Sequence, residues 1–392
     1  MTGTKLSQKD SLSSMVIFKI AHEWRIEIMR KLGISVYPNH SKKEEIKAYV
    51  ELAASYNFKR VFTCLLSVEG DQQQIIAEFT EIILHAKEHG MEVIADVSPK
   101  IFGELGISYN DLTFFKSIGA DGIRLDMGFT GNEESIMTFN PQDLKIELNI
   151  SNGTKYLENI LSYQANPSYL MGCHNFYPHR YTGLNFDHFI KTSKQYKEKG
   201  ITTAAFVNSP SAHIGPWPVD EGLCTLEMHR DLPIEVQAKH LWSTEVIDDV
   251  IIANAFATEE ELKKLSTIDP HQLTLNCELR EDIPTIEKKI VLEEFHFNRG
   301  DVSDYVIRST QSRVKYKGHE FKPFNTADIQ RGDIIVETSL YAHYAGELQV
   351  ALKPMKNSGK TNVVGHVSED ELFLLDQIKP WQKFKFNLKK EG

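Results

Sequence analysis

Short β-rich runs and longer amphipathic stretches alternate through the first two-thirds of the chain, and this rhythm restricts the fold most. Most of the β-rich runs end at intervals of about 30 residues, which is the length of one βα unit. Eight such units over roughly 230 residues match the size of a (β/α)₈ barrel. The pattern therefore predicts a TIM barrel. The predicted strands are residues 31–37, 60–68, 91–97, 122–127, 144–150, 170–176, 201–208 and 249–256.

An open doubly wound sheet is the rival α/β architecture. Such a sheet would normally carry a glycine-rich phosphate turn after its first strand. Here the first strand is followed by YPNH at residues 37–40, and no G-x-G-x-x-G stands there. The barrel is therefore the preferred reading.

The rhythm changes after about residue 270, and no long helical pattern follows. We predict an N-terminal tail or extension over residues 1–30, a TIM-barrel catalytic domain over 31–270, and a smaller mostly-β domain over 271–392. The strand-like runs of that last domain are residues 273–280, 290–296, 302–309, 333–338 and 347–352.

Composition narrows the class of partner. The 392 residues carry 54 acidic against 44 basic side chains, a net charge of −10, which disfavours nucleic acid. No apolar run approaches the ~20 residues of a membrane helix, and no signal peptide is evident. The four cysteines form no C-x-x-C pair, which fits a reducing compartment. We expect a cytoplasmic protein with no membrane partner; the oligomeric state is not predicted.

Side chains alternate along a strand, so each predicted strand has a face toward the helices and a face toward the barrel interior. On residues 122–127, Ile123, Leu125 and Met127 should meet the helices, whereas Arg124 and Asp126 should point inward. The same alternation directs polar or aromatic side chains inward elsewhere: Ser35, Tyr37, Ser67, Glu69, Asp96, Ser98, Glu147, Asn149, His174, Phe176, Asn208 and Asn254.

Four of these side chains are carboxylates and are the candidate catalytic residues. Two inward carboxyls on nearby strands are the apparatus of glycoside hydrolysis, where one protonates the leaving oxygen and the other attacks or activates water. Purely structural roles remain open for two of these residues. Glu147 could form a buried ion pair with Arg124, and Glu69 could cap the next helix. The candidates are Asp126, Glu69, Asp96 and Glu147.

Loops after the sixth and seventh strands are rich in aromatic and cationic side chains, which suit a sugar face and an anionic group. His174 could instead be a core histidine, and the long seventh loop could be a structural excursion. An aromatic wall is expected from Tyr37, Phe176, Tyr177, Tyr181 and Trp217. The predicted substrate contacts are Tyr37, Asn149, His174, Asn175, Tyr177, Arg180, Asn208, Arg230 and Arg308.

Other chemistries find little support in the motifs. The sequence has no H-E-x-x-H zinc motif and no G-x-S-x-G nucleophile elbow. A dispersed metal site of Asp96, Asp126 and His174 remains as an alternative, although no metal or other cofactor is expected.

Several motifs, taken in order, resemble one bacterial family. They are GISVYP at residues 33–38, IRLD at 123–126, CHNFYP at 173–178, RYTGL at 180–184, and Arg308-Ser309. Each motif is weak alone, but the combination is similar to a family formerly called "outer surface protein" and now associated with 6-phospho-N-acetylmuramidase activity. The resemblance runs from about residue 31 to the C-terminus.

The resemblance implies a TIM barrel followed by a cyclophilin-like β domain. It also implies hydrolysis of the β-1,4 bond of 6-phospho-N-acetylmuramyl-N-acetylglucosamine during cytoplasmic cell-wall recycling. The products would be N-acetylmuramic acid 6-phosphate and N-acetylglucosamine. The motif residues carried over as site candidates are Asp126, His174, Asn175 and Arg180. The alternatives are a metal-dependent aldolase, epimerase or isomerase on a phosphorylated sugar, and a non-catalytic carbohydrate-binding protein.

Overall fold

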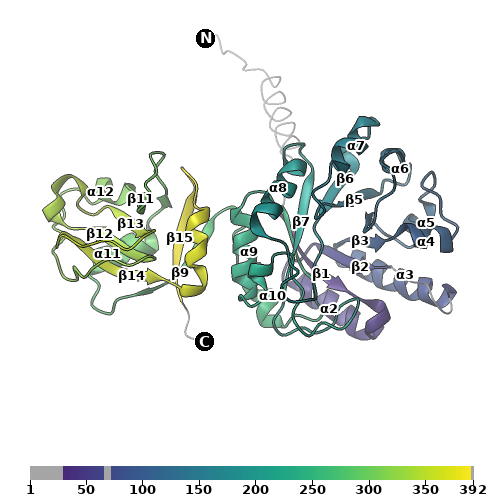
Figure 1. The fold of residues 1–392 in the computed structure, drawn as a ribbon. Helices are drawn as coiled ribbons and strands as arrows, with labels where there is room; N and C mark the ends of the chain where they lie inside the picture. The colour runs from purple at the N-terminus through teal and green to yellow at the C-terminus, as the bar shows by residue number, and fades with distance from the viewer. Residues whose placement is uncertain (1–29, 66–71, 390–392) are drawn as a thin grey trace, which may run out of the picture. The chain divides into compact units, whose positions relative to one another are not determined.

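Eight parallel strands close a barrel in the order β1 to β8 (Figure 1). The computed structural model describes residues 30–65 and 72–389, so nearly all of the predicted tail over 1–30 lies outside the described residues. The predicted TIM barrel is confirmed. Its strands are Leu32–Val36, Arg60–Cys64, Glu92–Val97, Gly122–Leu125, Lys145–Asn149, Leu170–Cys173, Thr202–Val207 and Asp249–Ile252.

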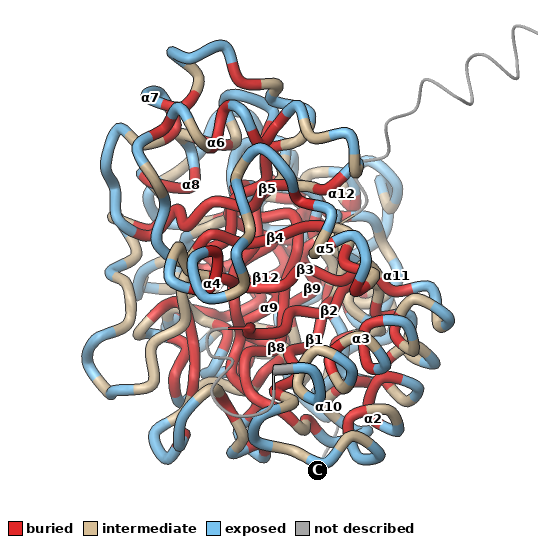
Figure 2. Tube along the Cα trace, turned by 90° about the vertical axis from the view of Figure 1, so that its right-hand side faces the viewer, coloured by how far each residue is buried: buried red, intermediate tan, exposed pale blue. Residues whose placement is uncertain are grey.

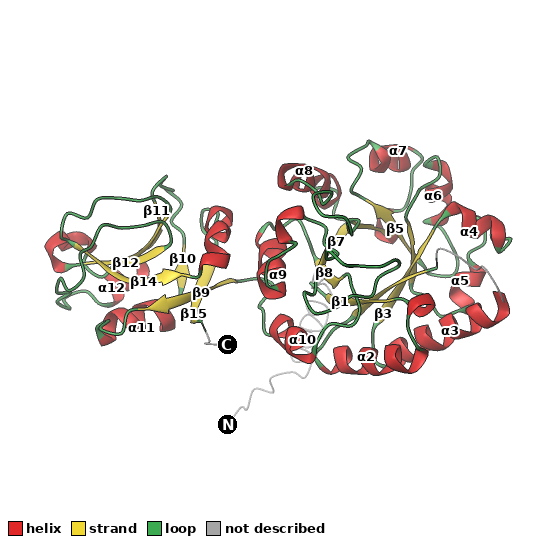
Figure 3. Ribbon diagram, turned by 60° about the horizontal axis from the view of Figure 1, so that its bottom comes forward, coloured by secondary structure: helices red, strands yellow, loops and turns green. Residues whose placement is uncertain are grey.

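Helices surround the strands and bury their apolar stripes against them (Figure 3). In α2, for example, Ile46, Tyr49, Val50 and Ala53 recur at helical spacing and are all buried. The short helices α4 and α6 lie in the connections that follow β3 and β4. The helices of the barrel region are α2 (Lys43–Ser55), α3 (Gln72–Glu88), α4 (Pro99–Glu104), α5 (Thr113–Ser117), α6 (Asn132–Met137), α7 (Tyr156–Ser162), α8 (Phe186–Lys197), α9 (Ile234–Ser243) and α10 (Glu259–Ser266).

The barrel strands are buried almost throughout, whereas the helices expose their outer faces (Figure 2). Ile123 and Leu125 of β4 join the core against the helices, as the alternation predicts. Met127 does not, because β4 ends at Leu125 and the chain then turns outward, leaving Met127 exposed.

A second sheet of seven strands follows in the C-terminal region, in the order β10-β15-β9-β14-β12-β13-β11. The predicted mostly-β character is confirmed, but one predicted strand is wrong. Part of 290–296 belongs to helix α11 (Thr285–Glu293), whose buried Glu287, Ile290 and Val291 follow helical spacing. The strands are β9 (Leu273–Leu279), β10 (His296–Phe297), β11 (Val306–Ser309), β12 (Asp333–Glu337), β13 (Leu348–Ala351), β14 (Thr361–Val367) and β15 (Lys383–Leu388), with a short helix α12 at Gln311–Lys315.

Among the helices in the described part of the chain, none combines the length and the apolar character needed to cross a membrane.

Candidate active site

A buried ion network lies in the barrel interior, toward the ends at which the strands begin. Arg60 of β2 donates to Glu147 of β5 and, at 2.9 Å, to Asp249 of β8. All three side chains are essentially inaccessible to solvent. The sequence left open a pair of Glu147 with Arg124; Glu147 pairs with Arg60 instead, although Glu147 and Arg124 are neighbours in strand register. Because its carboxylate is buried against Arg60, Glu147 has the surroundings of a structural ion pair and does not open onto the mouth.

A second guanidinium forms the layer above this network. Nη1 of Arg124 donates to Oδ1 of Asp96 at 2.6 Å and to Oδ1 of Asp126 at 3.4 Å. Nη2 of Arg124 donates to Oδ1 of Asn175, which follows β6. One buried arginine thus links the carboxyl ends of β3, β4 and β6, the edge at which TIM barrels place their active sites.

The two carboxylates on Arg124 have different surroundings. Asp96 is buried, and burial raises its pKa to about 6 against the opposing effect of the Arg124 charge. Asp126 keeps 40% of its side chain exposed to solvent. One buried carboxyl with a raised pKa beside one that reaches solvent is the asymmetry that lets two carboxylates take different roles.

The end of β5 and the loop after it fix the rim beside Asp126. Nδ2 of Asn149 donates to the backbone oxygen of Asp126 at 3.1 Å, and its Oδ1 accepts from the backbone N–H of Ser151 at 3.0 Å. The hydroxyl of Ser151 accepts from the backbone N–H of Asn175 at 2.8 Å. Asn149 and Asn175 therefore both lie at this rim, joined through Ser151. The alternation of Glu147, Asn149 and Ser151 could have identified Ser151, which the sequence analysis missed.

His174 does not point into the barrel, contrary to the prediction. Asn149 is in register with Cys173, so Cys173 takes the inward position and His174 turns toward the helices. Its Nε2 lies 2.8 Å from the hydroxyl of Ser193 on α8, and its ring packs on Phe189. Burial lowers the pKa of His174 to about 3, as expected for a neutral core imidazole.

The dispersed metal site considered from the sequence is not assembled. Its two carboxylates, Asp96 and Asp126, meet at Arg124, but His174 faces the opposite side of the β6 strand. A cationic guanidinium between the carboxylates also opposes a metal ion at that point.

Two predicted substrate contacts instead hold the long loop that follows β7. Every nitrogen of the Arg230 guanidinium donates within the protein, to Glu227 and to backbone oxygens that include those of Tyr177 and His179. The side chain of Asn208 accepts from the backbone N–H of Leu223 at 2.8 Å and is buried. Neither Arg230 nor Asn208 presents a free polar group to a ligand, so both act as supports of the loop.

Arg180 and Tyr177 lie on the loop after β6, and both side chains remain partly exposed to solvent. Arg180 pairs with Asp231 through two bonds of 2.6 and 2.9 Å, and about a third of its side chain remains exposed. Tyr177 is partly buried, and this burial raises the pKa of its hydroxyl, which lies beside Ser151. These two residues remain candidates for contact with a ligand at the rim.

Phe176 and Trp217, two members of the expected aromatic wall, come together, whereas Tyr37 does not join them. Phe176 packs on Phe62 and Phe206 in the barrel interior, and on its other side it meets the exposed ring of Trp217 at a centroid distance of 6.1 Å. Tyr37 is buried and donates its hydroxyl to the backbone oxygen of Ala253, so its ring is not open to a sugar.

Of the other predicted residues, Glu69 lies outside the described part of the chain. Arg308 stands on β11, where it donates to Glu347 at 2.7 Å and faces the ring of Tyr344. Arg313 donates to the same buried carboxylate at 2.8 Å, so these contacts of Arg308 lie within the C-terminal region.

Comparison with known proteins gives two consecutive family matches. Residues 32–267 match the model described as 6-phospho-N-acetylmuramidase, N-terminal, and residues 273–387 match its C-terminal counterpart. A search of curated proteins finds no match.

Two solved structures resemble the chain over most of its length. An uncharacterized B. cereus protein is 52% identical, with a TM-score of 0.85 over 91% of this chain and 99% of that one. A conserved Enterococcus faecalis protein of unknown function is 24% identical, with a TM-score of 0.67 over 92% of this chain and 96% of that one. The second likeness extends to the fold alone.

Proposed function

The chain belongs to the 6-phospho-N-acetylmuramidase family, and on this premise we propose that it hydrolyses the β-1,4 bond of 6-phospho-N-acetylmuramyl-N-acetylglucosamine. The products are N-acetylmuramic acid 6-phosphate and N-acetylglucosamine. The observation that carries the proposal is the arrangement of Asp96 and Asp126 on the single guanidinium of Arg124 at the barrel mouth.

Asp126 is the proposed catalytic carboxylate. Its side chain reaches solvent, its backbone is held by Asn149, and one of its oxygens rests on Arg124. Glycosidases need a carboxyl group that touches the scissile bond, and among the described candidates Asp126 is the one with an exposed side chain. It either donates a proton to the leaving glycosidic oxygen as the C–O bond breaks, or attacks the anomeric carbon of the sugar; the N-acetyl group of the substrate is an alternative nucleophile.

Asp96 and Arg124 are the proposed positioning residues beneath Asp126. Both are buried, so neither has the access to solvent that direct proton exchange with a bound sugar requires. Their ion pair fixes the guanidinium that in turn orients Asp126 and Asn175. Such fixed positions matter for catalysis, because a misplacement of a catalytic group by about 1 Å can lower the rate strongly.

The rim supplies groups for an anionic sugar. Trp217 and Phe176 offer an aromatic surface for a pyranose face, and Arg180 is a surface guanidinium on the neighbouring loop. We assign the phosphate to Arg180, because a planar guanidinium binds phosphate oxygens in pairs. On binding, the phosphate would compete with Asp231 for the same nitrogens.

The reaction is proposed to serve cell-wall recycling in the cytoplasm. The four cysteines are buried and unpaired, which supports a reducing compartment. The phosphorylated substrate distinguishes this role from that of an enzyme acting on unmodified cell wall.

The test is an incubation of the purified chain with the 6-phosphorylated muramyl disaccharide and, separately, with its unphosphorylated counterpart. Release of free N-acetylglucosamine from the phosphorylated substrate alone supports the proposal. Cleavage of both substrates at equal rates contradicts the assignment of the phosphate, and cleavage of neither contradicts the function.

A further inference from the structure

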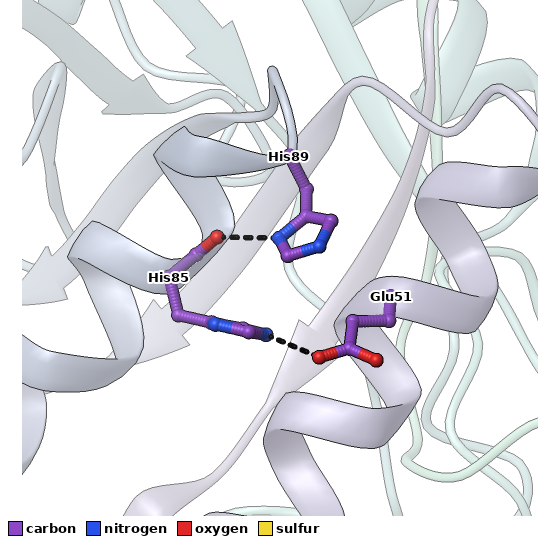
Figure 4. Close-up of side chains that lie close together, drawn as sticks. All are labelled: Glu51, His85 and His89. Carbon is purple, nitrogen blue, oxygen red and sulfur yellow. Dashed lines mark hydrogen bonds and ion pairs between the residues drawn. The ribbon is translucent and has the colours of Figure 1, made fainter.

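A carboxylate and two imidazoles converge on the outer helical layer of the barrel, away from the candidate active site. Glu51 comes from α2, His85 from the last turn of α3, and His89 directly follows that helix (Figure 4). Their potential ligand atoms all lie within 4.8 Å of one another. We propose that Glu51, His85 and His89 bind a divalent transition-metal ion of the zinc class.

The local fold brings the three side chains together. His85 and His89 are four residues apart, a spacing that places side chains on one face of a helix, and their ring centroids are 4.5 Å apart. Ion pairs of Glu81 with Lys43, at 2.6 Å, and with Lys47 hold α3 against α2 one turn before His85. Glu51 follows Lys47 by one turn and so meets His85.

The tautomer of His89 suits a ligand. Its Nδ1 lies 2.9 Å from the backbone oxygen of His85. A carbonyl oxygen can only accept, so Nδ1 carries the proton and Nε2 keeps its lone pair. Imidazoles that bind metals are typically oriented in this way, by a hydrogen bond from the other ring nitrogen to a carbonyl or carboxylate.

His85 presents the second nitrogen. Its Nε2 lies 3.2 Å from Oε1 of Glu51, yet the atom is buried and makes no hydrogen bond of good geometry. Two ligands of a tetrahedral zinc ion with bonds of ~2.0–2.2 Å stand about 3.3–3.6 Å apart. The observed separation is therefore close to that of two ligands on one metal ion, and Figure 4 shows the two groups pointing toward each other.

The donor set selects the class of metal. Two imidazole nitrogens and one carboxylate form a zinc ligand set, whereas Mg²⁺ and Ca²⁺ prefer oxygen ligands alone. Three protein ligands leave a fourth position for water. An isolated ion pair between His85 and Glu51 would account for their contact, but it would not account for a ring nitrogen of His89 lying within 4.8 Å of the ligand atoms of both.

The position of the cluster predicts a structural effect. His89 precedes the first residues of β3, whereas Asp96 stands near the other end of that strand. In TIM barrels, the end at which the strands begin is associated with stability rather than catalysis. A metal ion bound here would tie α2 to α3, and hydrolysis would not depend on it.

The experiment is a titration of the chelator-treated full chain with Zn²⁺, followed by calorimetry and by thermal unfolding. We expect one equivalent to bind with micromolar or tighter affinity and to raise Tm, and Mg²⁺ to have no effect. Glu51→Gln and His89→Ala should each weaken binding at least tenfold and abolish the rise in Tm. His271→Ala, which replaces an exposed histidine elsewhere, should bind as the unaltered chain does.

Absence of binding, or binding that Glu51→Gln and His89→Ala leave unchanged, would overturn the proposal. Zn²⁺ binding and Tm are read without any substrate, so the outcome is independent of the proposed glycosidase activity. In turn, equal rates of hydrolysis before and after chelation would leave the zinc proposal intact and confirm its structural character.

Discussion

The guanidinium of Arg124 lies 2.6 Å from the carboxylate of Asp96, and both groups are buried directly beneath the exposed carboxylate of Asp126. The same guanidinium also bonds to Asn175, so this ion pair fixes the positions of residues from three strand ends.

Arg124→Lys should lower kcat by about 10- to 100-fold with a smaller change in KM. A lysine keeps the charge but has no planar fork, so it cannot bond to Asp96, Asp126 and Asn175 together. Steady-state kinetics on the phosphorylated disaccharide measure the effect, and circular dichroism checks the fold. A variant with unaltered kcat would show that the bridging geometry is dispensable.

Asp96→Asn should change how stability depends on pH. Burial raises the pKa of Asp96 from about 4 to about 6, so between these values the native state holds a proton that the unfolded chain has released. The contribution of Asp96 to the free energy of unfolding is therefore largest below pH 4. It decreases as the pH rises from 4 to 6, by at most about 3 kcal/mol in all.

Urea unfolding of both proteins at several pH values checks this prediction. The stability of the unaltered chain relative to Asp96→Asn should decline between pH 4 and pH 6 and then level off. If the stability difference between the two proteins rose with pH instead, the charge of Arg124, and not burial, would dominate the pKa of Asp96.

Glu147→Gln should destabilise the fold while leaving the chemistry intact. Removing one partner from the buried group of Arg60, Glu147 and Asp249 commonly costs about 3–5 kcal/mol. Urea unfolding should detect that loss, and kcat per folded molecule should stay within about threefold of the unaltered enzyme. If kcat collapsed and stability did not, Glu147 would return as a catalytic candidate.

Arg180→Ala should raise KM for the phosphorylated disaccharide by about 10- to 100-fold, because a hydrogen bond to a charged group contributes about 1.5–3 kcal/mol. Asp231→Asn is the matched control, since it breaks the same surface ion pair but keeps the guanidinium. Michaelis–Menten kinetics should show a raised KM in the first variant only. An equal effect in both would indicate that the ion pair merely orders the loop.

The sequence predicts the barrel and the chemistry of its fourth and fifth strands because regular alternation persists there. Ile123 and Leu125 pack outward while Arg124 and Asn149 point inward, as the two-residue period requires. The same argument fails for His174, because Cys173 takes the inward position on the sixth strand and His174 faces the helices. Strand register sets that choice, and register depends on contacts with neighbouring strands.

Long-range pairing accounts for the other errors. Glu147 bonds to Arg60, 87 residues earlier in the chain, rather than to its register neighbour Arg124. Arg230 is predicted to bind substrate because it is a cationic residue on a long loop. In the folded protein, all of its guanidinium nitrogens donate to groups of the surrounding loops. No local pattern could distinguish these uses, because they depend on which backbone oxygens the fold brings within reach.

The most direct measurement is kcat/KM of Asp126→Asn on 6-phospho-N-acetylmuramyl-N-acetylglucosamine, beside Asp143→Asn. Asp143 is an exposed aspartate with a positive φ that asparagine also tolerates, and it precedes the start of β5, away from the mouth. We expect a loss of about three or more orders of magnitude for Asp126→Asn and near-normal activity for Asp143→Asn. Near-full activity in Asp126→Asn would contradict this expectation.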